Sequence, residues 1–178
     1  LLLTWPFRRS TGRQRKIFYG HKEKKPASGF WAFTLVLLAL ALSGYGMREA
    51  LRVPPVREVR MQVPGLPDAL NGFRIAQLSD LHIGPTFGKA WLTDVVARTD
   101  SLNPDLIVIT GDVVDGSPSR LEEDVAPLAD LKAKYGVIFA PGNHEYYSGI
   151  QQWLPVFQRL GMHVLMNENT QIRVNGTP

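Results

Sequence analysis

Short apolar runs alternate with longer amphipathic stretches from residue 73 onward, and this alternation constrains the fold more than any other feature. The runs have the length of strands, and the stretches between them place apolar residues at helical spacing. Apolar strands joined by helices are typical of an α/β layered domain whose sheet is buried on both faces. The expected strands are 73–79, 106–110, 137–140 and 164–166, and the expected helices are 89–102, 121–134, with a potential break at Pro127, and 150–160.

Two further segments flank this alternating region. Segment 56–63 alternates loosely between apolar and polar residues, which predicts an edge strand. Two prolines before it, Pro54 and Pro55, cannot continue a helix and indicate a stiff linker. Segment 171–174 is expected to begin a hairpin arm.

Polar motifs follow three of the expected strands, where ligands bind in sheets of this kind. The first motif contains Asp80 and His82. Residues two apart in an extended segment point the same way, so this carboxylate and imidazole would converge on one point. Such a pair suits a borderline metal such as Mn, Fe or Zn. An exposed turn pair is the alternative interpretation.

The second and third motifs add a carboxylate, an amide and an imidazole. Asp112 follows a strand directly and could bridge two cations, although an Asp that caps a turn is the alternative. Asp115 and Gly116 are expected to form that turn. The Asn143 amide oxygen could bind a metal, and His144 could donate a proton to a leaving oxygen. These alternatives would have to coincide at three strand ends, so we favour one joint site.

The N-terminal part of the chain is basic and then apolar. Residues 1–47 hold eight Lys or Arg and one Glu, whereas the remainder is slightly acidic. Segment 29–47 carries no charge, which predicts a transmembrane helix at the short end of the usual length; a cleavable signal peptide is the alternative. Lysines at 22–25 place the N-terminus in the cytoplasm by the positive-inside rule, and arginines after residue 47 oppose that orientation.

The absence of cysteine limits the possible chemistry. It excludes disulfides, a thiol nucleophile and thiolate metal sites. Any metal must therefore be held by oxygen and imidazole nitrogen.

The three motifs, LSDLHIG, TGDVVDG and PGNHEYY, resemble those of the calcineurin-like metallophosphoesterase family. That family's pattern is D-x-H, G-D-x-x-D and G-N-H-[DE], followed by a lone His and by G-H-x-H. The resemblance covers about residues 56–178, and the apolar segment before it is similar to the family's bacterial membrane-anchored branch. It implies an α/β fold, a four-layer β-sandwich flanked by helices, of which this chain holds only the N-terminal half, preceded by a transmembrane helix.

The resemblance also implies an activity, a cofactor and roles for residues. The activity is hydrolysis of a phosphomonoester or phosphodiester by water that two metal ions activate, the ions being Mn, Fe or Zn. Asp80 and His82 would bind the first metal, Asp112 would bridge both, and Asn143 would bind the second. His144 would protonate the leaving group.

The family's later histidines have no match in this sequence. His21 lies in the basic arm, and we interpret His163 as structural. The second metal would have only two protein ligands, which is few for a stable site. We therefore expect a fragment of a longer protein, truncated at both ends and inactive alone.

The expected organisation has four parts: a basic arm or cytoplasmic loop at 1–28, a transmembrane helix at 29–47, a linker at 48–55 and a partial phosphoesterase domain at 56–178. We expect the protein in the bacterial inner membrane, with the domain on the extracytoplasmic side. Tethering to the bilayer makes lipids and nucleotide-lipids candidate substrates, and no nucleic-acid partner is expected. The alternative is a truncated, catalytically incompetent membrane protein whose domain only binds a partner.

Overall fold

The computed structural model describes residues 29–174, which divide after Gly46 into two units. Helix α1 (Gly29–Ala50) begins in the first unit and has 22 residues, none of them buried. At 1.5 Å per residue it is about 33 Å long. Among the described residues it is the one helix with the length and composition of a membrane span, and a signal sequence near the N-terminus would share these properties. The expected basic arm at 1–28 lies outside the described residues.

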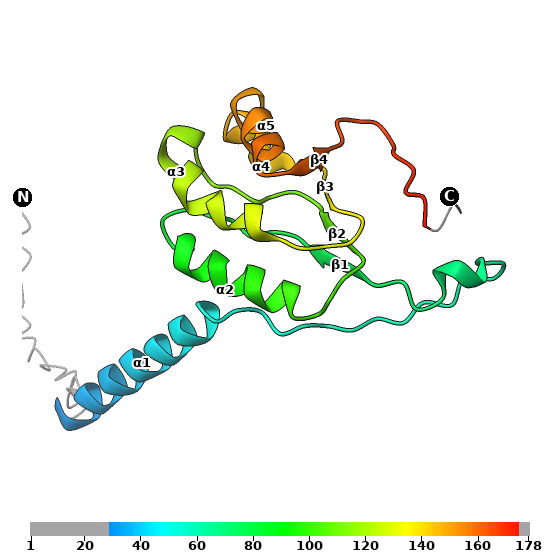
Figure 1. Ribbon diagram of the computed structural model, residues 1–178. Helices are drawn as coiled ribbons and strands as arrows, with labels where there is room; N and C mark the ends of the chain where they lie inside the picture. The colour runs from blue at the N-terminus through cyan, green and yellow to red at the C-terminus, as the bar shows by residue number, and fades with distance from the viewer. Residues whose placement is uncertain (1–28, 175–178) are drawn as a thin grey trace, which may run out of the picture. The chain divides into compact units, whose positions relative to one another are not determined.

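The second unit is built on one parallel sheet with strand order β1-β2-β3-β4 (Figure 1). Helices connect each strand to the next, which confirms the predicted mixed α/β fold. The strands are β1 (Ile75–Leu78), β2 (Leu106–Ile109), β3 (Val137–Phe139) and β4 (Met162–Val164). The helices are α2 (Lys89–Asp100), α3 (Pro118–Val125), α4 (Asn143–Tyr147) and α5 (Ile150–Arg159), with 3-10 turns η1 (Asp68–Leu70) and η2 (Ala126–Asp130).

The two faces of the sheet differ in burial among the described residues. Ile109 and Phe139 are paired across neighbouring strands, point to one face and are fully buried. Helix α2 packs against η2 and α3, and α3 packs against α5, so the helices form a continuous layer. The opposite face carries the row Gln77, Val108, Ile138 and His163, none of which is buried. The prediction that both faces are buried is therefore wrong for this part of the chain.

Aromatic side chains anchor helix α5 in the core. The ring of Phe157 lies 4.4 Å from that of Phe139 and stacks 5.3 Å from that of Trp153. The Trp153 indole is fully buried and donates a hydrogen bond to the Gly116 carbonyl at 2.9 Å. This contact ties α5 to the loop that follows β2, next to the predicted site.

Several predicted elements differ from the structure. Segment 56–63 forms no strand; Val59 and Met61 are exposed there, because alternation gives a strand only where another strand's edge is available for pairing. The expected helix 121–134 starts earlier and ends at Val125, since Pro127 has no N–H to continue it.

Two smaller differences concern the C-terminal region, and one concerns the sheet. The fourth strand is Met162–Val164 rather than 164–166, so His163 lies within the strand and is exposed. Segment 171–174 shows only a single bridge residue, Val174, which is buried. Of the expected sandwich, residues 29–174 form one sheet.

Candidate metal centre

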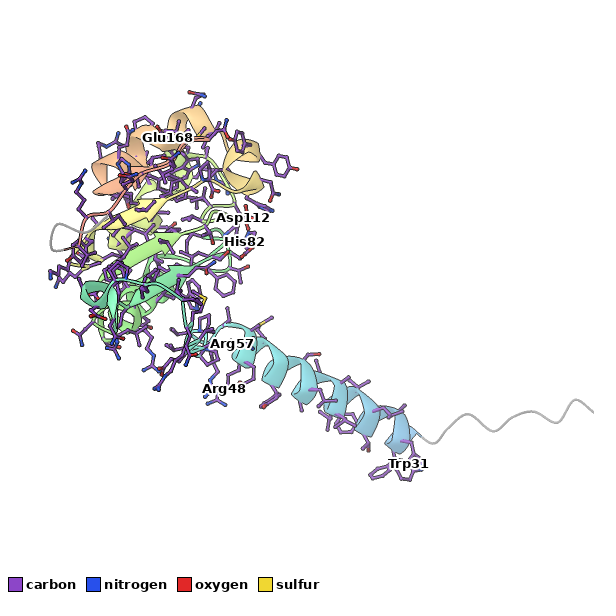
Figure 2. All side chains as sticks on the ribbon, turned by 90° about the vertical axis from the view of Figure 1, so that its right-hand side faces the viewer. Trp31, Arg48, Arg57, His82, Asp112 and Glu168 are labelled. Carbon is purple, nitrogen blue, oxygen red and sulfur yellow. The ribbon has the colours of Figure 1, made fainter. Side chains whose placement is uncertain are left out.

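The candidate site lies where β1 and β2 end. Beyond these strands the two segments of the chain continue side by side. The backbone N–H of His82 donates to the Asp112 carbonyl at 3.0 Å, and that of Ile83 donates to the Val113 carbonyl at 2.8 Å. His82 and Asp112 lie together at one edge of the domain (Figure 2). The third motif arrives from β3 through Gly142 and opens helix α4 at Asn143. Asn143 and His144 are therefore in the first turn of a short helix.

The backbone is left-handed at three of the predicted site residues. The φ angles are 56° at Asp80, 45° at His82 and 54° at Asp112. Residues other than glycine adopt this region rarely, at a cost of roughly 1–3 kcal/mol each. Such conformations persist only where the surrounding structure enforces them, and they gather at functional sites.

Two glycines allow the second and third motifs to cross at close range. A Cβ added to Gly111, whose φ is 90°, would lie 2.9 Å from the Pro141 carbonyl carbon and closer still to the backbone of Gly142. A Cβ added to Gly142 would lie 2.7 Å from the Asp112 N atom and would overlap the Asp112 carboxylate. The glycines of both motifs are thus required by packing between the loops.

A buried carboxylate joins these loops from beneath. Glu145 is fully buried and accepts hydrogen bonds from four backbone N–H groups. Its Oε1 accepts from Val113 at 2.6 Å and Val114 at 3.3 Å. Its Oε2 accepts from Asp112 at 2.9 Å and Gly142 at 2.7 Å. The Gly142 bond is also half of a capping box at the start of α4.

Three side chains, one from each motif, meet on the outer side of the loops that Glu145 holds together. Atoms of His82, Asp112 and His144 that could bind a metal all lie within 4.8 Å of one another. The two imidazole rings are 4.5 Å apart and nearly perpendicular. The backbone N–H of His144 donates to Asp112 Oδ1 at 3.0 Å, which orients that carboxylate. Two imidazoles and a carboxylate fit a divalent Mn, Fe or Zn ion.

Asp115 holds both histidines. Its Oδ1 lies 3.0 Å from His82 Nδ1 and 2.6 Å from His144 Nδ1. If each Nδ1 donates to this carboxylate, each Nε2 is left to bind a metal or to face a substrate. The hydrogen bond to Asp115 raises the pKa of His82 above its usual range. Burial works to raise the pKa of Asp115, but the hydrogen bonds and the charges of the two histidines together outweigh it and lower that pKa.

The other two predicted residues lie at the margin of this group. The Asp80 carboxylate is more than half exposed, and its Oδ1 is 3.9 Å from His82 Nε2. The neighbouring Ser79 hydroxyl donates a hydrogen bond to it. Asn143 is the first residue of α4 and its side chain is exposed. The structure therefore brings His82, Asp112 and His144 together, with Asp80 beside His82 and Asn143 adjacent to His144 in the chain.

Sequence reasoning missed two residues of this site. The sequence predicts only a turn at Asp115. Its position three residues after Asp112 is the signal that could have indicated a place in the same site. Glu145 received no role, although a Glu two residues after Asn143, at the third position of a helix, fits a capping box.

Comparisons with known proteins agree with this geometry. The family model for calcineurin-like phosphoesterase matches residues 73–175. A Danio rerio protein named "Transmembrane protein with metallophosphoesterase domain" is 37% identical over 84% of this chain and 35% of its own length. Its Bos taurus namesake is 38% identical over 79% of this chain and 32% of its own length. An uncharacterized metallophosphoesterase of Campylobacter jejuni is 31% identical over 78% of this chain and 37% of its own length.

These relatives come from both animals and bacteria, and the chain spans about a third of the length of each. No solved structure matches this chain significantly. The family model covers more than half of the chain, including all three motifs and every residue of the candidate centre. The chain therefore belongs to the calcineurin-like phosphoesterase family.

Proposed function

We propose that this chain carries metal-binding and proton-donating residues of a phosphoester hydrolase that is anchored in a membrane. The observation that carries the proposal is the convergence of His82, Asp112 and His144 from three separate motifs. The backbone is left-handed at His82 and Asp112, and the buried Glu145 carboxylate accepts a hydrogen bond from the Asp112 N–H. An ordinary solvated surface would not require this arrangement.

The proposed ligands divide between two metal ions. Asp80 and His82 would hold one ion, since His82 Nε2 and Asp80 Oδ1 face each other at 3.9 Å. Asp112 would contribute to both ions, and Asn143 would hold the second. When bound, the ions would act as Lewis acids and bring the pKa of a water molecule toward neutrality.

His144 is the proposed proton donor. Asp115 engages its Nδ1, which leaves Nε2 to carry a proton to the oxygen of the departing group. Asp115 also fixes the orientation of this ring, as a carboxylate does for the histidine of a catalytic triad. The ring edge meets the His82 ring, so the donor lies beside the proposed ligands.

The proposed location follows from α1 and from the names of the relatives. A 22-residue helix that is uncharged up to Met47 and has no buried side chain has the properties of an anchor. Two relatives are named transmembrane proteins. We propose a bacterial inner-membrane protein with its domain on the extracytoplasmic side, acting on a phosphomonoester or phosphodiester that can be lipid-linked. The proposed parts remain an arm at 1–28, a membrane helix at 29–47, a linker at 48–55 and a domain from 56 to 178.

The test compares hydrolysis and metal content in the protein at its natural length. Wild type, Asp112→Asn and the exposed control Asp94→Asn are assayed with bis(p-nitrophenyl) phosphate and Mn²⁺. We expect the Asp112 variant to lose roughly a hundredfold or more in rate and to retain less metal, while the control matches wild type. Wild-type protein with neither metal nor activity would refute the hydrolase and leave a membrane-anchored binding domain.

A further inference from the structure

A shallow hollow of about 470 Å³ opens beside the candidate centre. It is lined by the loop after β2 and by the end of α4. His144 and Asp115 belong both to this hollow and to the candidate centre. The other lining residues are Gly116, Ser117, Tyr147 and Ser148. Whatever occupies the hollow must therefore lie against the proposed proton donor.

Three of the polar groups that line the hollow already have partners in the protein. The Ser148 hydroxyl donates to the Val114 carbonyl at 3.1 Å. The Gly116 carbonyl accepts from the Trp153 indole at 2.9 Å. The Ser117 hydroxyl lies 2.9 Å from that of Ser119. A ligand that needed hydrogen bonds would find few here, so the lining favours an apolar group.

Tyr147 provides a large apolar surface at the rim. It is 80% exposed. The ring meets that of His144 edge to face, with centroids 5.8 Å apart. An exposed aromatic ring that touches the proposed proton donor is placed to contact a group bonded to the oxygen that receives the proton.

We propose that this hollow binds the leaving group of the substrate and selects esters whose leaving group carries an aromatic ring. The inference rests on the proposed hydrolysis. In that reaction the oxygen of water forms a bond to phosphorus, and the bond from phosphorus to the leaving oxygen breaks. The leaving oxygen takes a proton from His144, and the proton lost by water restores His144 or passes to solvent. The alcohol is thus released with its ring beside Tyr147, in the open hollow.

The test uses two phosphonates that cannot be hydrolysed. Phenylphosphonate and methylphosphonate carry the same charged head and differ in the group that would enter the hollow. Their dissociation constants are measured by calorimetry on the Mn²⁺-loaded protein at its natural length. We expect phenylphosphonate to bind roughly tenfold more tightly, because an open hollow buries part of the ring.

Variants of two neighbouring tyrosines distinguish a specific contact with the ring from nonspecific binding of an aromatic group. Tyr147→Ala should reduce the preference to about threefold or less while the methylphosphonate constant stays unchanged. Tyr147→Phe keeps the ring and should keep the preference. Tyr146→Ala is the matched control, because Tyr146 is also exposed on α4 and does not line the hollow.

The outcomes distinguish this proposal from the hydrolase itself. Equal binding of the two phosphonates, or the same loss in both tyrosine-to-alanine variants, would overturn the leaving-group site while hydrolysis stood. A ring preference that depends on Tyr147 in a protein that hydrolyses no ester would support the binding site and refute the hydrolase. Binding of neither phosphonate to metal-loaded protein would overturn the leaving-group site, and the hydrolysis assay would still decide on the hydrolase.

Discussion

Replacing Glu145 by Gln tests whether the buried carboxylate holds the candidate centre together. The substitution keeps the size of the side chain and changes one carboxylate oxygen into an NH₂ group. Each of the two oxygens accepts two backbone N–H groups, which come from the second motif and from Gly142. Whichever oxygen is replaced, two N–H donors then face another donor; those of Val113 and Val114 are buried and those of Asp112 and Gly142 partly buried.

The magnitude follows from that count. A buried donor left without an acceptor costs about 1–3 kcal/mol, so two cost roughly 2–6 kcal/mol. Domains of this size are stable by only about 5–15 kcal/mol. We therefore expect Glu145→Gln to remove a large part of the free energy of unfolding, although the buried residue keeps its volume.

Hydrogen exchange and urea unfolding give two independent readouts of this loss. In the variant, the amides of 112–114 and of Gly142 should exchange about 30-fold faster for each 2 kcal/mol lost. The urea midpoint, followed by the fluorescence of buried Trp153, should fall by roughly 1 M or more. Glu123→Gln, on the exposed face of α3, should change stability by less than about 0.5 kcal/mol.

The reasoning would be refuted by a variant whose urea midpoint matches that of the control. It would also fail if exchange rose equally throughout the domain while the amides at 112–114 kept their relative protection. That second result would show a general loss of stability with no special role for the carboxylate beneath the loops.

The remaining predictions concern the same centre. Binding of Mn²⁺ should tighten as pH rises through the raised pKa of His82, above about 6.5, because a bound metal displaces the proton; Asp115→Asn should move this rise to lower pH, as titration calorimetry at several pH values would show. In the metal-free chain, the interaction of His82 with Asp115 contributes its full stabilisation through His82 below about pH 6.5. That contribution to the free energy of unfolding is lost as pH rises through the folded pKa of His82. The lowered pKa of Asp115 has the opposite sign: its contribution is present above about pH 4 and is lost as pH falls through its folded value. Gly142→Ala should weaken metal binding at least tenfold, since its Cβ overlaps a ligand carboxylate, whereas Gly88→Ala, with no neighbour closer than 3.4 Å, should bind metal as wild type does.

The layered fold was predictable because its signals are local. The strands β1, β2 and β3 begin or end within about two residues of the predicted limits, since short apolar runs between helical stretches have few other interpretations. Segment 56–63 alternates loosely between apolar and polar residues, which also predicts a strand, and yet it forms none. A strand also needs a pairing partner, and partners depend on contacts that the pattern of a single segment does not contain.

The candidate centre was predictable in part for a similar reason. Residues with recognisable chemistry, such as His82, Asp112 and His144, stand out at strand ends. The residues that support them do not, because Asp115 and Glu145 act through hydrogen bonds to segments about 30 residues away. Pattern reasoning assigned the Asp to a turn and left the Glu without a role, since neither contact can be deduced from neighbours in the sequence.

The left-handed backbone at Asp80, His82 and Asp112 and the buried Glu145 are two sides of one arrangement. Three such conformations cost roughly 3–9 kcal/mol together, which is comparable to the stability of the whole domain. The hydrogen bonds to Glu145 act on the segment that contains Asp112, and that segment pairs directly with the segment of His82. Strain at the proposed ligands is therefore opposed within the same two loops. A variant that relieved the strain, such as Asp112→Gly, should consequently be more stable than Asp112→Ala, although both lack the carboxylate.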